Sequence, residues 1–116
     1  MRITRAADIE PKDMNMEGAE AVTMRVLVGP DEGAPTFVMR LFEVEPGGHT
    51  PMHQHAWEHE IFVLDGEGEV VTPEARMPLR PQTAAFVAPN ETHQFVNSGS
   101  QTFRFLCLIP LQAQPC

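Results

Sequence analysis

The chain has 116 residues, of which 42% are hydrophobic and 21% are charged, proportions typical of a globular protein with a buried core. This length fits a single domain. With 16 acidic and 8 basic residues, the formal net charge is −8, which argues against nucleic acid or an anionic membrane surface as a partner.

Short apolar segments rich in β-branched and aromatic residues recur along the chain, separated by Pro, Gly, Asn and Asp. No long segment repeats its apolar residues with the 3.6-residue period of a helix, so the pattern predicts an all-β sandwich or barrel. The predicted strands are residues 23–28, 36–44, 59–64, 69–72, 84–87, 93–96 and 102–109. Residues 29–33 and 45–48 are predicted breakers, and residues 65–66 and 97–100 are predicted hairpin turns.

The first 20 residues carry little pattern and predict an N-terminal arm or strand (residues 1–20), followed by a barrel domain (residues 21–116). The N-terminal residues lack the apolar run of a secretory signal and no segment reaches about 18 apolar residues, so we expect a cytoplasmic protein. Cys107 and Cys116 have no spacing that favours a disulfide, and we interpret both as thiols.

Histidine gives the strongest functional signal. Four of the five histidines fall into two groups, His53-x-His55-x3-His59 and, later, His93. Residues two apart on a strand point to the same face, so His53 and His55 present two imidazoles side by side, and His59 has the same parity. Glu60 then points outward. The strand at 93–96 is expected to deliver His93 from the opposite side of a barrel.

These four imidazoles suit a metal ion. Neutral imidazole binds Zn, Cu, Fe, Ni and, with added waters, Mn. A structural tetrahedral zinc site normally includes cysteine, whereas four histidines on rigid strands leave two octahedral positions open. A single His-x-His pair is often only two surface side chains, but four grouped histidines favour a metal site. We therefore predict one divalent metal ion on His53, His55, His59 and His93.

Residues 47–66 and 89–97 resemble the two signature motifs of the cupin superfamily. Segments 37–42, 57–64 and 105–110 are similar to small single-domain bacterial cupins with a four-histidine manganese site. The resemblance implies an all-β fold, a double-stranded β-helix or jelly-roll barrel. It also implies Mn²⁺ as the first choice of metal and Fe²⁺ as the second, with Cu²⁺, Ni²⁺ or Zn²⁺ as further candidates.

The motifs depart from the family pattern at three positions. Most cupins carry a glutamate as the third residue of the first motif, where His59 stands at the shorter allowed spacing and Glu60 at the longer, so Glu60 is the rival ligand. In the second motif, Thr83 and Glu91 replace glycines, while His93 is retained. This puts the local turn in doubt, and not the ligand.

Other residues are candidates for a substrate pocket. Phe105, Cys107 and Ile109 share the inward face of the last strand and would form an apolar wall, although plain core packing is an equal interpretation. Cys107 is also a candidate oxidation target beside a redox metal. Arg40 would hold an anionic group inside the barrel or pair with an acid outside, and Trp57 would form a lid or simply pack.

His49 and Glu60 are candidates for an outer shell around the metal ligands. His49 precedes a proline at the expected barrel mouth and would serve as a proton shuttle there, with plain surface placement as the alternative.

The leading functional hypothesis is a metal-dependent oxygenase that uses Mn or Fe with dioxygen or peroxide on a small apolar or aromatic substrate. Similar small cupins imply oxidative cleavage of carbon–carbon double bonds. One alternative is a non-catalytic module that binds metal or a small molecule. Another is a metal-dependent isomerase or lyase, in which the metal polarises a carbonyl. Small cupins commonly dimerise, so a homodimer is expected.

Overall fold

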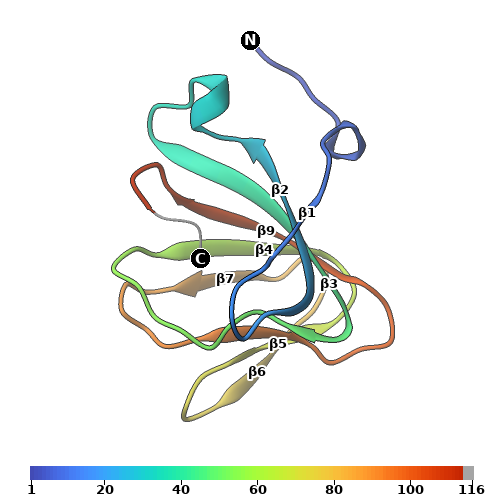
Figure 1. The fold of residues 1–116 in the computed structure, drawn as a ribbon. Helices are drawn as coiled ribbons and strands as arrows, with labels where there is room; N and C mark the ends of the chain where they lie inside the picture. Colours follow the sequence, from blue (N-terminus) through green and yellow to red (C-terminus); the bar gives the residue numbers. More distant parts are fainter. Residues whose placement is uncertain (114–116) are drawn as a thin grey trace.

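Strands make up almost all regular structure in the computed structural model, which describes residues 1–113 (Figure 1). They are, in chain order, β1 (Lys12–Asp13), β2 (Glu20–Val28), β3 (Phe37–His49), β4 (His59–Asp65), β5 (Gly68–Val71), β6 (Arg76–Leu79), β7 (Ala84–Val87), β8 (Gln94–Asn97) and β9 (Phe103–Pro110). Two short 3-10 turns are added, η1 (Ala6–Asp8) and η2 (Pro30–Glu32). The all-β prediction is confirmed. Cys116 and the end of the predicted barrel domain lie outside the described residues.

The strands form one curled antiparallel sheet in the order β6-β5-β8-β3-β9-β4-β7, and β2 with β1 joins at β3. Strand β3 is shared by both halves of the barrel. Its first part pairs with β9, from Phe37 opposite Pro110 onward, and its last residue, His49, pairs with Val96 of β8. The curled, strand-sharing sheet is the predicted jelly-roll barrel.

The bend that lets β3 pass from one half of the barrel to the other falls at Gly47 and Gly48. Gly47 has a φ of +83°, which a side chain would strain, and a Cβ on Gly48 would lie 2.6 Å from the Glu20 carbonyl oxygen. The prediction that residues 45–48 end this strand is therefore wrong. The glycines redirect the strand, and residues 45–48 lie between its paired segments, where the register with β2 shifts between Glu20 and Val22.

The two predicted hairpin turns are turns, but they do not close hairpins. β4 pairs with β7 and β9, whereas β5 pairs with β6 and β8, so residues 65–66 carry the chain from one half of the barrel to the other. Residues 97–100 do the same between β8 and β9. Crossings of this kind wrap the chain into a barrel and bring its far-apart segments together at one mouth.

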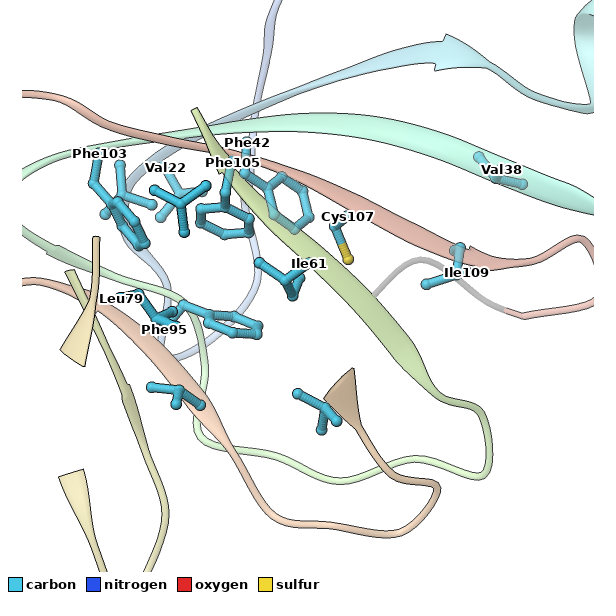
Figure 2. Close-up of a cluster of buried hydrophobic side chains, with 14 residues drawn as sticks. Val22, Val38, Phe42, Ile61, Leu79, Phe95, Phe103, Phe105, Cys107 and Ile109 are labelled. Atoms are coloured by element: carbon cyan, nitrogen blue, oxygen red, sulfur yellow. The ribbon is translucent and has the colours of Figure 1, made fainter. Parts of the chain in front are cut away.

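The core lies between the two halves of the barrel, and β9 contributes to it with strict alternation. On β9, Phe103, Phe105, Cys107 and Ile109 are buried, as predicted, and the intervening residues are half-buried. Figure 2 shows the Phe42, Phe95 and Phe105 rings gathered inside, with the Cys107 sulfur on the same side of β9. The Phe42 and Phe105 rings meet edge to face at 5.2 Å, which favours one fixed packing arrangement.

The N-terminal segment lies along the outer side of the barrel of its own chain. β1 pairs with β2, Lys12 opposite Met24, and the Arg25 Nε donates a 2.8 Å hydrogen bond to the Ile9 carbonyl oxygen. β2 itself begins at Glu20, where the arm was expected to end. Within residues 1–113, no helix is long and apolar enough to span a membrane.

Candidate metal centre

The two histidine groups meet at one mouth of the barrel through a direct backbone contact. His53 and His93 form an isolated antiparallel bridge, in which each amide nitrogen donates to the other's carbonyl oxygen, at 3.0 and 2.9 Å. His93 therefore arrives beside His53, and not from the opposite side of the barrel as expected. Because a backbone pair fixes the spacing of two chain segments, this bridge sets the positions from which both rings project.

The other two histidines come from the segment that leads into β4. His55 lies two residues beyond His53, and His59 is the first residue of β4. Inward parity on β4 is as predicted, since His59, Ile61 and Val63 are buried while Glu60 is exposed. The chain bends at Ala56 and Trp57 before β4, and the inward parity of β4 then directs the His59 imidazole into the barrel.

All four imidazoles converge. The His53 ring centroid lies 5.1 Å from those of His55 and His93, and the His59 centroid lies 4.6 Å from that of His55 and 5.0 Å from that of His93. Ring nitrogens of His53, His55 and His93 all lie within 4.8 Å of one another. The His59 Nε2 lies 2.7 Å from the His55 Nε2. Adjacent nitrogen ligands of one ion are about 3 Å apart when the metal–nitrogen bonds are about 2.1 Å.

Hydrogen bonds at Nδ1 orient two of these rings. The His55 Nδ1 lies 2.9 Å from the Trp57 carbonyl oxygen, and the His93 Nδ1 lies 2.8 Å from the Glu91 carbonyl oxygen. A carbonyl only accepts, so each Nδ1 carries the hydrogen and each Nε2 keeps its lone pair. The His93 Nε2 is buried and has no hydrogen-bond partner within residues 1–113. A buried acceptor of this kind fits a cation as its partner.

The rings are held neutral. Burial, followed by repulsion from His93, His55 and Arg40, lowers the pKa of His53 to about 4. Burial and the Arg40 charge lower the pKa of His59 much further, and burial also lowers the pKa values of His55 and His93. Metal ions bind deprotonated imidazole, so these shifts keep the nitrogens available well below neutral pH. The residues present therefore fit a divalent cation.

Trp57 lies directly against one ring of the cluster. Its indole stacks on the His55 imidazole with centroids 4.3 Å apart and an interplanar angle of 5°. The indole ring also packs against the apolar core, and its Nε1 is buried without a hydrogen-bond partner among the described residues. Trp57 thus restrains the His55 ring as well as contributing an apolar surface beside it.

Arg40 and Cys107 lie behind His59, on the side of its Nδ1. The Arg40 Nη2 donates a 2.9 Å hydrogen bond to the Cys107 Sγ and lies 3.5 Å from the His59 Nδ1, which itself lies 2.8 Å from that sulfur. The guanidinium also lies over the Phe42 ring, 4.9 Å from its centroid. Both residues were expected in a substrate pocket, and both lie against His59, a predicted metal ligand.

The remaining candidates divide between the core and the surface. Phe105 and Ile109 are buried in the core, at 0% and 5% exposure. His49 is half-buried, with its Nδ1 3.3 Å from the Thr50 carbonyl oxygen and 3.4 Å from the Gln94 Nε2. Glu60 is exposed on the outer face, where it borders two surface grooves with Leu108. The rival ligand therefore points away from the histidine rings.

A model of the cupin domain matches residues 40–109, well over half of the chain and all four clustered histidines. This chain is a cupin. The solved structures that resemble it agree with this result and extend it to nearly the whole chain. The polyketide cyclase RemF from Streptomyces resistomycificus superposes with a TM-score of 0.93 at 38% identity, over 99% of this cupin and 82% of RemF.

Two further comparisons cover different proportions of their proteins. A predicted oxalate decarboxylase from Thermotoga maritima has a TM-score of 0.82 at 26% identity, over 95% of this cupin and 99% of that protein. The 1-methylthio-D-xylulose 5-phosphate methylsulfurylase of Rhodospirillum rubrum is 30% identical over 71 residues, 61% of this cupin. The cupin spans 46% of that curated relative's length. Relatives with several different activities therefore share this barrel.

Phe95 lies at the site and was not predicted from the sequence. Its ring centroid lies 5.6 Å from that of His93 and 6.2 Å from that of His59, so it forms the apolar floor beneath the histidine cluster of this cupin. The signal was available, because Phe95 is two residues from His93 on an extended segment and must share its face. The carbonyl groups of Trp57 and Glu91 had no comparable signal, since a backbone contact leaves no trace in residue type.

Proposed function

We propose that this cupin is a metal-dependent enzyme that holds one divalent cation on His53, His55, His59 and His93. The observation that carries the proposal is the convergence of four neutral imidazoles around the His93 Nε2, a buried acceptor without a protein partner within residues 1–113. Mn²⁺ is the proposed ion and Fe²⁺ the second choice. When bound, the cation would supply Lewis acidity and, for Mn or Fe, redox chemistry.

The protein residues would contribute orientation and exclusion of water. Backbone carbonyls hold the His55 and His93 rings with Nε2 inward, and the Trp57 indole keeps the His55 ring from turning. Phe95 closes the inner side with an apolar surface. Because no carboxylate belongs to this ligand set, the cation's charge would stay uncompensated and favour an anionic oxygen ligand.

For the reaction, we propose oxygenation of a small apolar or aromatic substrate, in which dioxygen cleaves a carbon–carbon double bond and gives two carbonyl products with one oxygen atom each. The aromatic surroundings of the histidines support an apolar substrate. A second candidate is redox-neutral ring closure of a polyketone, in which a carbon–carbon bond forms, water is lost and no dioxygen is consumed. Similarity to the polyketide cyclase RemF over 99% of the chain favours this candidate.

The metal site is tested first. The purified protein is stripped with a chelator and dialysed against Mn²⁺, and the bound metal is counted by mass spectrometry for the wild type, His55→Ala, His93→Ala and the control His49→Ala. We expect about one ion per chain in the wild type and His49→Ala, and a large loss in the other two variants. Undiminished metal in His93→Ala would overturn the site.

The reaction class is tested with the Mn-loaded protein and two probes, an aryl alkene and a linear aromatic polyketone. Dioxygen uptake that matches aldehyde formation from the alkene supports the oxygenase. Ring closure of the polyketone without dioxygen uptake supports the cyclase instead. Metal binding with turnover of neither probe supports the non-catalytic binding module.

We also propose that the protein is a homodimer. Phe37 and Phe86 are exposed at 59% and 62% on the outer face, beside the two grooves that Glu60 and Leu108 border. Exposed apolar side chains around one surface region often mark an association surface. Light scattering should give twice the 12.9 kDa chain mass, and Phe86→Ser should shift that mass toward the monomer. A monomeric wild type would refute the dimer.

A further inference from the structure

The four imidazoles differ in what holds the nitrogen that faces away from the cluster. In His55 and His93, the Nδ1 lies against a backbone carbonyl, at 2.9 and 2.8 Å. In His59, the Nδ1 lies 2.8 Å from the Cys107 sulfur and 3.5 Å from the Arg40 Nη2. His59 is thus oriented by side chains of two other strands, β9 and β3, and not by its own backbone segment.

Sheet register explains why these groups meet. Cys107 on β9 pairs with Arg40 on β3 at one edge and with Ile61 on β4 at the other. Ile61 is two residues from His59, so the three side chains share the inner face of three adjacent strands. All three residues are buried, with exposures of 0% for Cys107 and His59 and 2% for Arg40. The contact is therefore built by the fold and does not depend on a mobile surface side chain.

The chemistry of the three groups decides which one supports His59. When the Nε2 of a neutral imidazole binds a cation, the remaining ring hydrogen is on Nδ1 and needs an acceptor. A guanidinium has donors only, so Arg40 does not accept it. The Cys107 sulfur has lone pairs and already accepts a 2.9 Å hydrogen bond from the Arg40 Nη2. The sulfur can therefore accept from both neighbours.

We propose that Cys107 is a positioning residue that accepts a hydrogen bond from the His59 Nδ1, and that Arg40 fixes the sulfur in place for that contact. This inference depends on the proposed metal site. It assigns both residues to the support of a ligand and removes them from the list of groups that would touch a substrate. Outer contacts of this kind commonly change metal affinity by about 10- to 100-fold.

The test compares replacements at Cys107. Cys107→Val keeps an apolar side chain of similar volume but removes the acceptor, whereas Cys107→Ser keeps an acceptor. Ile109→Val is the matched control, because Ile109 is buried on the same face of β9 and is not among the hydrogen-bond partners of His59. Mn²⁺ affinity is measured from the free-ion signal in electron paramagnetic resonance. We expect about 10- to 100-fold weaker binding for Cys107→Val, most of it restored in Cys107→Ser, and no change for Ile109→Val.

A measurement on the unmodified protein removes the dependence on folded variants. In the Zn²⁺-loaded wild type, ¹⁵N nuclear magnetic resonance should place the His59 hydrogen on Nδ1, with slow exchange. Equal Mn²⁺ affinity in all four proteins would overturn the role of Cys107 while leaving the metal site intact. A His59 with its hydrogen on Nε2 would overturn both the contact with Cys107 and the place of His59 among the metal ligands. Failure of the wild type to bind either ion would instead overturn the metal site.

Discussion

Replacement of His93 by alanine should abolish most of the stabilisation that a metal ion gives to the fold. His93 is almost fully buried, its Nε2 has no other partner within residues 1–113, and its backbone is paired with that of His53. The variant loses the ring but keeps the amide pairing. The loss should therefore fall on ion binding more than on the barrel itself.

The size of the effect follows from linkage. A ligand at 100 times its dissociation constant stabilises the folded state by about 2.7 kcal/mol. An unfolding entropy of about 2.1 cal/mol/K per residue gives about 0.24 kcal/mol/K for the 116-residue chain, so the wild-type Tm should rise by about 11 °C. If loss of His93 weakens binding 100-fold, the same ion concentration stabilises by only about 0.4 kcal/mol, and the shift falls to about 2 °C.

The assay is differential scanning calorimetry of each protein with and without Mn²⁺. The difference between the two scans is the quantity of interest, because truncation of a buried ring also lowers the metal-free Tm. His49→Ala is the control, since His49 lies outside the four-ring cluster, and it should keep the wild-type shift. An equal Mn²⁺-dependent shift in His93→Ala and the wild type would show that His93 does not hold the ion.

Three further predictions concern the metal-free protein. The pKa of His53 is lowered to about 4, chiefly by burial, while in the unfolded chain it is near 6.5. Between these two pH values the unfolded state therefore binds more protons than the folded state. The free energy of unfolding should fall as pH decreases from 6.5 to about 4. Urea titrations at a series of pH values would measure this, and stability that stays constant or rises on acidification would contradict it. Gly66→Ala should lower the free energy of unfolding by at least about 1–3 kcal/mol, because φ is +78° and the new Cβ would lie 2.3 Å from the Thr102 carbonyl oxygen. Gly33→Ala, at a φ of +85° with no atom within 4 Å, should cost only about 1 kcal/mol, and equal losses in urea would show that crowding at Gly66 is unimportant. Asn97→Asp should destabilise the folded protein by about 1–3 kcal/mol for each lost hydrogen bond, since the Asn97 Nδ2 donates to the Val44 and Gln101 carbonyl oxygens at 2.8 and 2.7 Å. An unchanged midpoint in chemical denaturation would count against these hydrogen bonds.

Local patterns in the sequence predicted most strands because short apolar segments recur between turn residues, and β4 and β9 alternate between buried and less buried residues. Strand β6 was missed because Pro78 and its exposed neighbours do not read as a strand. Proline is tolerated there because β6 is the edge of the sheet. Strand β3 was predicted too short for a related reason, since Pro46 and the two following glycines resemble a turn and in fact form a bend inside the strand.

The part of the candidate site that could be predicted is the part in which alternation along a strand decides which side chains point into the barrel. Parity placed His59 inside and Glu60 outside, and both positions agree with the structure. The positions of Arg40 and Cys107 behind His59 depend on the register of β3, β9 and β4, which no local pattern encodes. The same holds for the bridge between His53 and His93, because the pairing partner of a short segment is decided by the whole barrel.

Strand β3 is a single covalent span that pairs with β2, β8 and β9. Neither side of the molecule can melt without breaking pairs that the other side needs, so the domain should unfold in one cooperative step. Trp57, the single tryptophan, senses the histidine mouth, whereas circular dichroism senses every strand. Loss of the mouth and loss of the sheet should therefore share one midpoint, which makes tryptophan fluorescence a measure of the stability of the whole domain.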